Sequence, residues 1–258
     1  MKDIIRQVVN VLATLMVIVL NVLASALPLN GQTTGEISDR FDVYFVPAGY
    51  VFSIWGLIYL ALIAFAVYQA LPAQRDNPRL GSVGYLYALS CVANVAWLFL
   101  WHYEFFELTL VAMVALLLLL IAIYLRLGIG RSRVPNAEKW LVRVPFSIYL
   151  GWITVATIAN VTSLLDYLNW GGWGISPEAW AVVMLIAGAV IASAVSITRG
   201  DIAYILVIVW AFVGIAVKHS GTPIVAVTAI VMAVLVALTL LIGVPRARQQ
   251  MRVRTDYW

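Results

Sequence analysis

Eight long apolar runs occupy most of this 258-residue chain. Each lasts about twenty residues, which is the length that a helix needs to cross about 30 Å of hydrocarbon. A membrane-spanning strand would be about half as long and would alternate apolar with polar residues. The runs cover residues 5–27, 47–71, 81–101, 107–127, 138–163, 177–198, 201–217 and 221–244. The sequence therefore predicts an all-α integral membrane protein with about eight transmembrane helices.

The composition excludes an ordinary soluble domain. Apolar residues make up 64% of the chain and charged residues 11%, and the mean hydropathy is +0.98. Soluble domains are nearer to half apolar and one quarter charged. No connecting segment is long enough to hold a soluble domain, so we expect the function to lie in the membrane or at its two faces. The single cysteine, Cys91, leaves no intramolecular disulfide.

The basic residues predict the orientation. With the N-terminus in the cytoplasm, fourteen of the sixteen Lys and Arg side chains fall on the inside, and only Arg40 and Lys218 fall outside. We therefore expect both termini in the cytoplasm, and so complete an asymmetry fits a bacterial plasma membrane. The basic C-terminal segment is expected to face anionic lipid rather than nucleic acid.

The sequence carries no arrangement typical of catalysis or ion coupling. The acidic residues lie at the ends of the runs, and none lies at mid-depth. Lys218 also lies at a run end, which argues against a retinal Schiff base. His102 and His219 could each ligate a haem iron, but both positions are more typical of interfacial side chains. No nucleophile–base pair or metal cluster is apparent, so no catalytic residue is assigned and enzyme activity is not required.

Tryptophan, tyrosine and small polar side chains recur at one depth of three runs. At 1.5 Å per residue, they lie about 5 to 18 Å below the outer surface. The set comprises Trp55 and Tyr59 in the second run, Asn94 and Trp97 in the third, and Trp152, Thr157 and Asn160 in the fifth. Buried amide and indole groups need partners, so one interpretation is an interhelical hydrogen-bond cluster. The other is an aromatic-walled site for an apolar ligand, and both stay open.

Aromatic residues near the outer ends of the runs have a simpler interpretation. Trp170, Trp173 and Trp180, like Tyr44 and Tyr50, fit the belt of amphipathic rings expected at a membrane interface.

Three motifs fall on the runs that carry this polar and aromatic set. Residues 45–59 read FVPAGYVFSIWGLIY, residues 94–97 read NVAW, and residues 152–160 read WITVATIAN. In this order they resemble motifs of helices two, three and five in the TspO/MBR family, the tryptophan-rich sensory proteins related to the translocator protein or peripheral benzodiazepine receptor. Three differences stand beside the resemblance: Val46-Pro47 replaces a tandem proline, Gly49 or Tyr50 replaces the tryptophan after it, and Pro145 lies about one turn early.

The resemblance covers about residues 1–165 and implies a five-helix bundle there. Residues 166–258 would then form three additional transmembrane helices and a short basic cytoplasmic tail. These three helices would pack on the bundle through a stripe of small residues at Gly188, Ala192 and Ser196, or fill the face that five-helix members use to dimerise. A homodimer is left open.

The resemblance also implies a function. It predicts a membrane sensor or receptor that holds a flat apolar ligand, such as a porphyrin, haem, sterol or isoprenoid, in the outer half of the bilayer. Trp55, Asn94, Trp97, Trp152 and Asn160 would form or support the pocket, with Tyr59 and Thr157 beside them. Residues 28–46 would form a lid, with Pro47 and Tyr50 at its mouth, or else a solvated linker. The alternatives are a light-dependent porphyrin-degrading enzyme and a transporter of apolar molecules.

Overall fold

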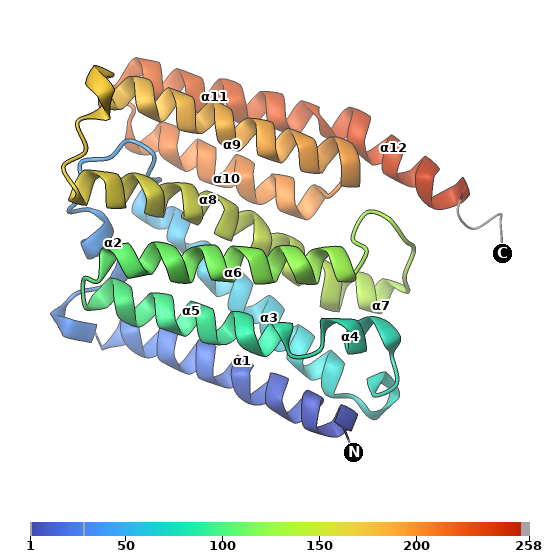
Figure 1. Cartoon of the computed structure of the whole chain (residues 1–258). Helices are drawn as coiled ribbons and strands as arrows, with labels where there is room; N and C mark the ends of the chain where they lie inside the picture. The colour runs from blue at the N-terminus through green and yellow to red at the C-terminus, as the bar shows by residue number, and fades with distance from the viewer. Residues whose placement is uncertain (1, 28, 254–258) are drawn as a thin grey trace.

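The computed structural model describes residues 2–27 and 29–253 (Figure 1). Every regular element in these residues is a helix, which confirms the all-α prediction. Pro28 of the predicted lid and residues 254–258 of the predicted tail lie outside the described residues. The eight main helices are α1 (Lys2–Ala26), α3 (Ile54–Ala70), α5 (Leu86–His102), α6 (Phe106–Arg126), α8 (Val144–Tyr167), α9 (Pro177–Arg199), α10 (Ile202–Lys218) and α11 (Pro223–Leu238).

The apolar helices have membrane-spanning dimensions. Six helical segments of the described chain are long and apolar enough to cross a membrane. The other two, α5 and α10, are apolar helices of 17 residues each, which corresponds to about 25 Å. The protein is thus an integral membrane protein, as predicted.

Shorter elements join these helices. They are η1 (Leu29–Gly31), α2 (Thr34–Ser38), η2 (Gly49–Ser53), η3 (Pro72–Gln74), α4 (Pro78–Val83), α7 (Asn136–Glu138), η4 (Lys139–Arg143), η5 (Gly172–Gly174) and α12 (Leu240–Val253). The helix α2 begins at a capping box, in which the Thr33 and Glu36 side chains each accept from the other's backbone N–H.

Two predicted boundaries differ from the observed ones. The run predicted at 81–101 is broken at Gly84, where α4 ends and the backbone takes a φ of +52°. Glycine adopts this conformation without a steric penalty, so the chain turns before α5 begins. The predicted basic tail also begins as helix, because α12 follows α11 after Thr239 and continues past Pro245 to Val253.

Five helices form a closed ring. Going round it, α1 packs against α3, α3 against α8, α8 against α6, α6 against α5, and α5 against α1. The ring includes the first five predicted spans and matches the predicted five-helix bundle. Figure 1 shows α8 on the side of this bundle that faces the remaining helices.

The three C-terminal helices pack on the ring through α10 and α8. A Cβ atom added at Gly151 of α8 would lie 3.1 Å from both the Tyr204 carbonyl oxygen and Val207 Cβ of α10, so the glycine permits this close approach. The predicted small-residue stripe on α9 faces two neighbours. Gly188 lies against Phe212 of α10, and Ser196 lies against Gly243 of α12.

The bundle has two distinct ends (Figure 1). At one, here called the loop end, lie the connections α1–α3, α5–α6, α8–α9 and α10–α11. At the other, the termini end, lie the start of α1, the short helices α4 and α7, and α12. The loop end corresponds to the side predicted to face outward.

Candidate functional site

A chain of hydrogen bonds crosses the interior of the five-helix ring at Asn94. The Asn94 side chain is 1% exposed. Its Oδ1 accepts from Asn21 Nδ2 of α1 at 2.9 Å, and its Nδ2 donates to the Tyr149 hydroxyl of α8 at 3.0 Å. One amide therefore joins α1, α5 and α8.

A second chain lies nearer the loop end and uses two more of the predicted residues. Trp97 Nε1 of α5 donates to Asn160 Oδ1 of α8 at 3.0 Å, and Asn160 Nδ2 donates to the Thr109 hydroxyl of α6 at 2.9 Å. The Trp97 ring also stacks on Trp101, with centroids 5.4 Å apart and planes at 19°. These contacts satisfy the polar atoms of Trp97 and Asn160, as an interhelical hydrogen-bond cluster requires.

Aromatic rings from α3 and α8 form a cluster beside the first chain. Trp55 stacks on Tyr59, with centroids 5.6 Å apart and planes at 24°. Its ring also meets Tyr149 edge-on at 6.1 Å and Trp152 at 6.2 Å. Phe52 contacts Trp152 from the other side at 5.7 Å. The predicted residues Trp55, Tyr59 and Trp152 thus lie together.

One polar atom of this cluster is left unpaired. Trp152 is 3% exposed, and its indole N–H has no hydrogen-bond partner among the described residues. A buried donor without an acceptor costs about 1–3 kcal/mol. The neighbouring amides of Asn94 and Asn160 are occupied, whereas the buried Trp152 N–H is free to bind something else.

Three predicted residues lie apart from these contacts. Thr157 is half-buried, and its hydroxyl donates to the Ile153 carbonyl of its own helix at 2.7 Å. Pro47 is buried against α10, where a Cβ added at Gly214 would lie 3.2 Å from its Cβ. Tyr50 is exposed and meets Trp210 of α10 edge-on at 5.4 Å.

The segment predicted as a lid packs across the loop end of the ring. Trp101 Nε1 donates to the Thr34 carbonyl at 3.2 Å, and Phe41 packs edge-on against Phe106 at 5.1 Å. Residues 29–46 are therefore bound to the ends of α5 and α6 rather than lying free as a linker.

The C-terminal helices hold the last part of this segment and the start of η2. The contacts are Ala48 N–H to the Gly214 carbonyl at 3.1 Å, Trp210 Nε1 to the Val51 carbonyl at 3.2 Å, Lys218 Nζ to Asp39 at 2.7 Å, His219 Nε2 to the Val46 carbonyl at 3.3 Å, and the Tyr44 hydroxyl to Glu178 at 3.0 Å. Because all five come from α9 and α10 or their ends, these helices fix the predicted lid in place.

Sequence reasoning missed several members of the ring interior. Asn21 lies within the first apolar run, so the argument that identified Asn94 could have found it. Tyr149 lies three residues before Trp152 and shares its helix face. Thr109 gave no signal, because a hydroxyl can bond to its own helix, as Thr157 does.

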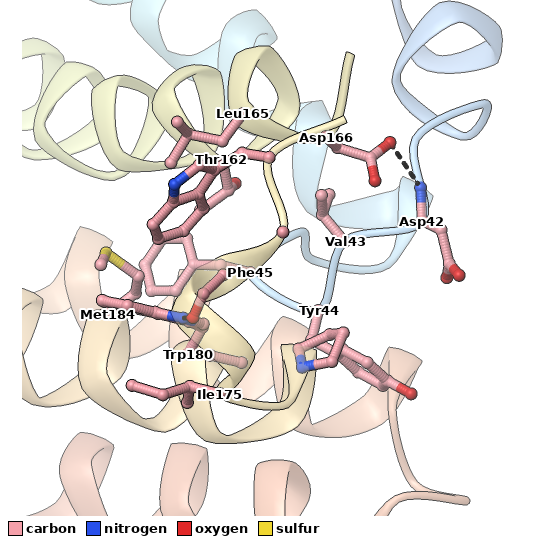
Figure 2. Close-up of a pocket in the computed structure, with 15 residues that line it drawn as sticks. Asp42, Val43, Tyr44, Phe45, Thr162, Leu165, Asp166, Ile175, Trp180 and Met184 are labelled. Carbon is pink, nitrogen blue, oxygen red and sulfur yellow. Dashed lines mark hydrogen bonds between the residues drawn. The ribbon is translucent and has the colours of Figure 1, made fainter. Parts of the chain in front are cut away.

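A separate cavity of about 310 Å³ lies at the loop end, between α8, α9 and the α1–α3 connection (Figure 2). Its wall includes Tyr44, Phe45, Trp170 and Trp180, and Asp42 and Asp166 also line it. None of the nine predicted site residues belongs to this wall. Two of the tryptophans that were interpreted as an interfacial belt, Trp170 and Trp180, therefore also line a cavity.

The described residues contain no group of three or more His, Cys, Asp or Glu side chains that could hold a metal ion. His102 is fully buried, and its Nδ1 lies 2.8 Å from the Leu98 carbonyl. His219 lies at the end of α10, where burial lowers its pKa below the ordinary value. The Val46 carbonyl opposes this shift, because a hydrogen bond to it favours the charged ring.

Comparison with known proteins gives one match. No curated protein and no solved structure matches the chain. The family model described as TSPO-like protein matches residues 7–242, which includes the five-helix ring and the helices α9, α10 and α11. Because this match covers most of the chain, the protein belongs to the TSPO-like family.

Proposed function

We propose that this protein is a ligand-binding membrane sensor that holds a flat apolar molecule inside the five-helix ring. Membership of the TSPO-like family supports a ligand-binding role in the membrane. We infer the position of the ligand from the buried Trp152 indole N–H. This group lacks an acceptor and lies within an aromatic cluster. A ligand oxygen would provide that acceptor.

The chemistry of the cluster favours a flat ligand. Trp55 with Tyr59, and Trp97 with Trp101, form two pairs of nearly parallel rings. Aromatic faces bury apolar ring systems well and favour offset stacking. A porphyrin, a haem or a sterol combines a flat apolar body with an oxygen-bearing edge, so these are the ligand classes that we propose.

We propose that the ligand enters the ring at the loop end, where the predicted lid lies. The α1–α3 connection covers this end of the ring and is held by α9 and α10. We propose that the loop end faces outward, with both termini in the cytoplasm, as the distribution of basic residues predicts.

The proposal is tested by titrating the purified protein with protoporphyrin IX and recording tryptophan fluorescence. Trp152→Phe removes the indole N–H while keeping an aromatic ring, and Trp55→Ala removes a stacking face. Trp140→Phe is the matched control, because Trp140 is exposed and lies in η4 at the termini end. Haem is tested in the same way, and cholesterol is added as a competitor.

The proposal predicts saturable quenching in the wild type and in Trp140→Phe. Loss of one hydrogen bond between uncharged groups corresponds to about 0.5–1.5 kcal/mol, so Trp152→Phe should raise the Kd about two- to twelvefold. Trp55→Ala should raise it further, because it also removes buried aromatic area. Quenching that does not saturate, or equal affinities in all variants, would show that the ligand does not bind in the ring.

A further inference from the structure

The cavity at the loop end lies outside the five-helix ring (Figure 2). It is enclosed by the last turns of α8, by the loop before α9 with the first turns of that helix, and by residues 42–45 of the α1–α3 connection. Its volume of about 310 Å³ falls at the lower end of the usual range for small-molecule sites, about 300–1,000 Å³. The cavity can therefore accommodate a small organic molecule, independently of the ring interior.

Two tryptophans of the wall are held in fixed positions. Trp180 Nε1 donates to the Gly172 carbonyl at 2.9 Å, and the rings of Trp170 and Trp180 lie 5.1 Å apart. Gly172 has a φ of +60°, which folds the loop back over Trp180. Since the Trp180 N–H is already bonded, this residue offers the cavity its apolar ring rather than a donor.

The cavity has an apolar side and an acidic side. Figure 2 shows Met184 and Ile175 on one side and Asp166 and Asp42 on the other, with the Asp42 carboxylate pointing away from the apolar side. One Asp166 oxygen accepts the Asp42 backbone N–H at 3.3 Å, which joins the two segments at this point.

Neither aspartate has a cationic partner among the described residues. The two basic side chains of the loop end are engaged elsewhere, Arg40 with Glu104 at 2.9 Å and Lys218 with Asp39 at 2.7 Å. The acidic side of the cavity is thus left without a counter-charge.

The helix α8 adds to this negative potential. Asp166 lies in its last turn, where the helix dipole is negative, and that turn contains no basic residue. The nearby Glu178 differs, because it lies in the first turn of α9 and accepts the Tyr44 hydroxyl. His219 contacts Tyr44 at 5.1 Å, but burial lowers its pKa and so disfavours its charged form.

We propose that this cavity binds an amphipathic cation, that is, a molecule with one ammonium group and an apolar body. The ammonium group lies against Asp166 and Asp42, and the body lies against Trp170, Trp180 and Met184. Indole faces bind both ammonium groups and apolar groups. The acidic side and the apolar side of the cavity can therefore bind the two parts of one molecule. The ammonium group belongs either to a free amine or to a choline lipid headgroup.

The probe for this site is benzyltrimethylammonium, with uncharged benzyl alcohol as the comparison ligand. Binding is measured by ligand-detected NMR on the full chain in phosphatidylglycerol nanodiscs. Asp166→Asn and Asp42→Asn each remove one charge from a different segment with little change of shape. Glu107→Gln is the matched control, because it also removes a loop-end acid but is exposed in the first turn of α6 and lies outside the cavity wall.

We expect saturable binding of the cation, with the Kd raised about three- to fivefold by Asp166→Asn and by Asp42→Asn, as for a partly exposed charge pair. Glu107→Gln should leave the Kd unchanged, and benzyl alcohol should show no dependence on either aspartate. Equal weakening by all three substitutions would mean general surface attraction and would overturn the proposal, as would non-saturable binding.

A second arm identifies the source of the cation. Phosphatidylcholine is added to the nanodiscs at increasing fractions. A rise in the apparent Kd of the probe, lost in Asp166→Asn, supports the site and assigns it to a lipid headgroup. An unchanged Kd that still depends on Asp166 supports the site and assigns it to a free amine.

Discussion

Gly214 of α10 lies against the segment that directly follows the predicted lid. A Cβ atom added there would lie 2.2 Å from Val51 Cγ2 and 3.2 Å from Pro47 Cβ. Val51 is fully buried and β-branched, so its methyl group cannot easily rotate away. The Gly214 carbonyl also accepts the Ala48 N–H at 3.1 Å. Gly214→Ala should therefore push the start of η2 away from α10.

The magnitude follows from two opposing effects. Overpacking of a buried contact costs about 1–3 kcal/mol. Replacing a helical glycine with alanine normally stabilises a helix by about 0.5–1 kcal/mol. We expect Gly214→Ala to be destabilising by about 1–2 kcal/mol. Gly56→Ala on α3 is the matched control, because an added Cβ there meets nothing within 4 Å, and it should be neutral or stabilising.

The assay is reversible unfolding in mixed micelles, together with hydrogen exchange at the Ala48 amide. Gly214→Ala should lower the free energy of unfolding and speed exchange at Ala48, whereas Gly56→Ala should do neither. In the double variant with Val51→Ala the clash is relieved, so the two effects should couple favourably by at least about 1 kcal/mol. If Gly214→Ala is as stable as Gly56→Ala, with unchanged exchange, α10 does not hold the segment after the lid as described.

Three further variants test other contacts. Asn94→Leu leaves the Tyr149 hydroxyl without its amide partner and should lower the free energy of unfolding by about 0.6–2 kcal/mol, whereas Thr157→Val should have a smaller effect. Gly243→Ala would place a Cβ 2.0 Å from the Ser196 carbonyl oxygen and should loosen α12 from α9, seen as faster hydrogen exchange in α12 but not in a Gly221→Ala control. The lowered pKa of His219 means that the folded state binds this proton less readily than the unfolded state. Stability should thus be complete above about pH 6.5 and fall as the pH drops below that value, and His219→Phe should remove this dependence in thermal melts; an identical pH profile in the variant would refute the assignment.

The spans could be predicted because each helix must be long enough and apolar enough to cross the hydrocarbon core of the membrane. For example, the run predicted at 177–198 is observed as α9, Pro177–Arg199. The break before α5 could not be predicted, because nothing in the sequence distinguishes Gly84, with its positive φ, from a glycine tolerated within a helix, such as Gly56. The positive φ of Gly84, which ends the run before α5, depends on tertiary packing rather than on the local sequence.

The polar residues of the ring interior could be predicted in part. A buried amide must find partners, so one of the two interpretations had Asn94 and Asn160 bonded to other helices, and both form such bonds. Their partners could not be named, because the order of helices around the ring follows from packing rather than from spacing. The ligand-binding role of these residues stays a prediction.

The cavity beside α9 gave no signal in the sequence. Trp170 and Trp180 were interpreted as interfacial residues, which is the usual role of tryptophan at a span end. Their meeting depends on the loop between α8 and α9, in which Asn169 and Trp173 have positive φ angles of 52°. Such conformations are uncommon for residues other than glycine, and the sequence does not predict them.

The central claim is that a flat apolar ligand occupies the interior of the five-helix ring beside Trp152. The most direct test is photoaffinity labelling of the full chain in nanodiscs with a diazirine-bearing porphyrin, followed by mass-spectrometric mapping of the labelled residues. The account predicts labels on α3 and α8 around Trp55 and Trp152, which excess protoporphyrin IX removes. Labels confined to the segment 170–184, or labels that excess protoporphyrin IX does not remove, would contradict it.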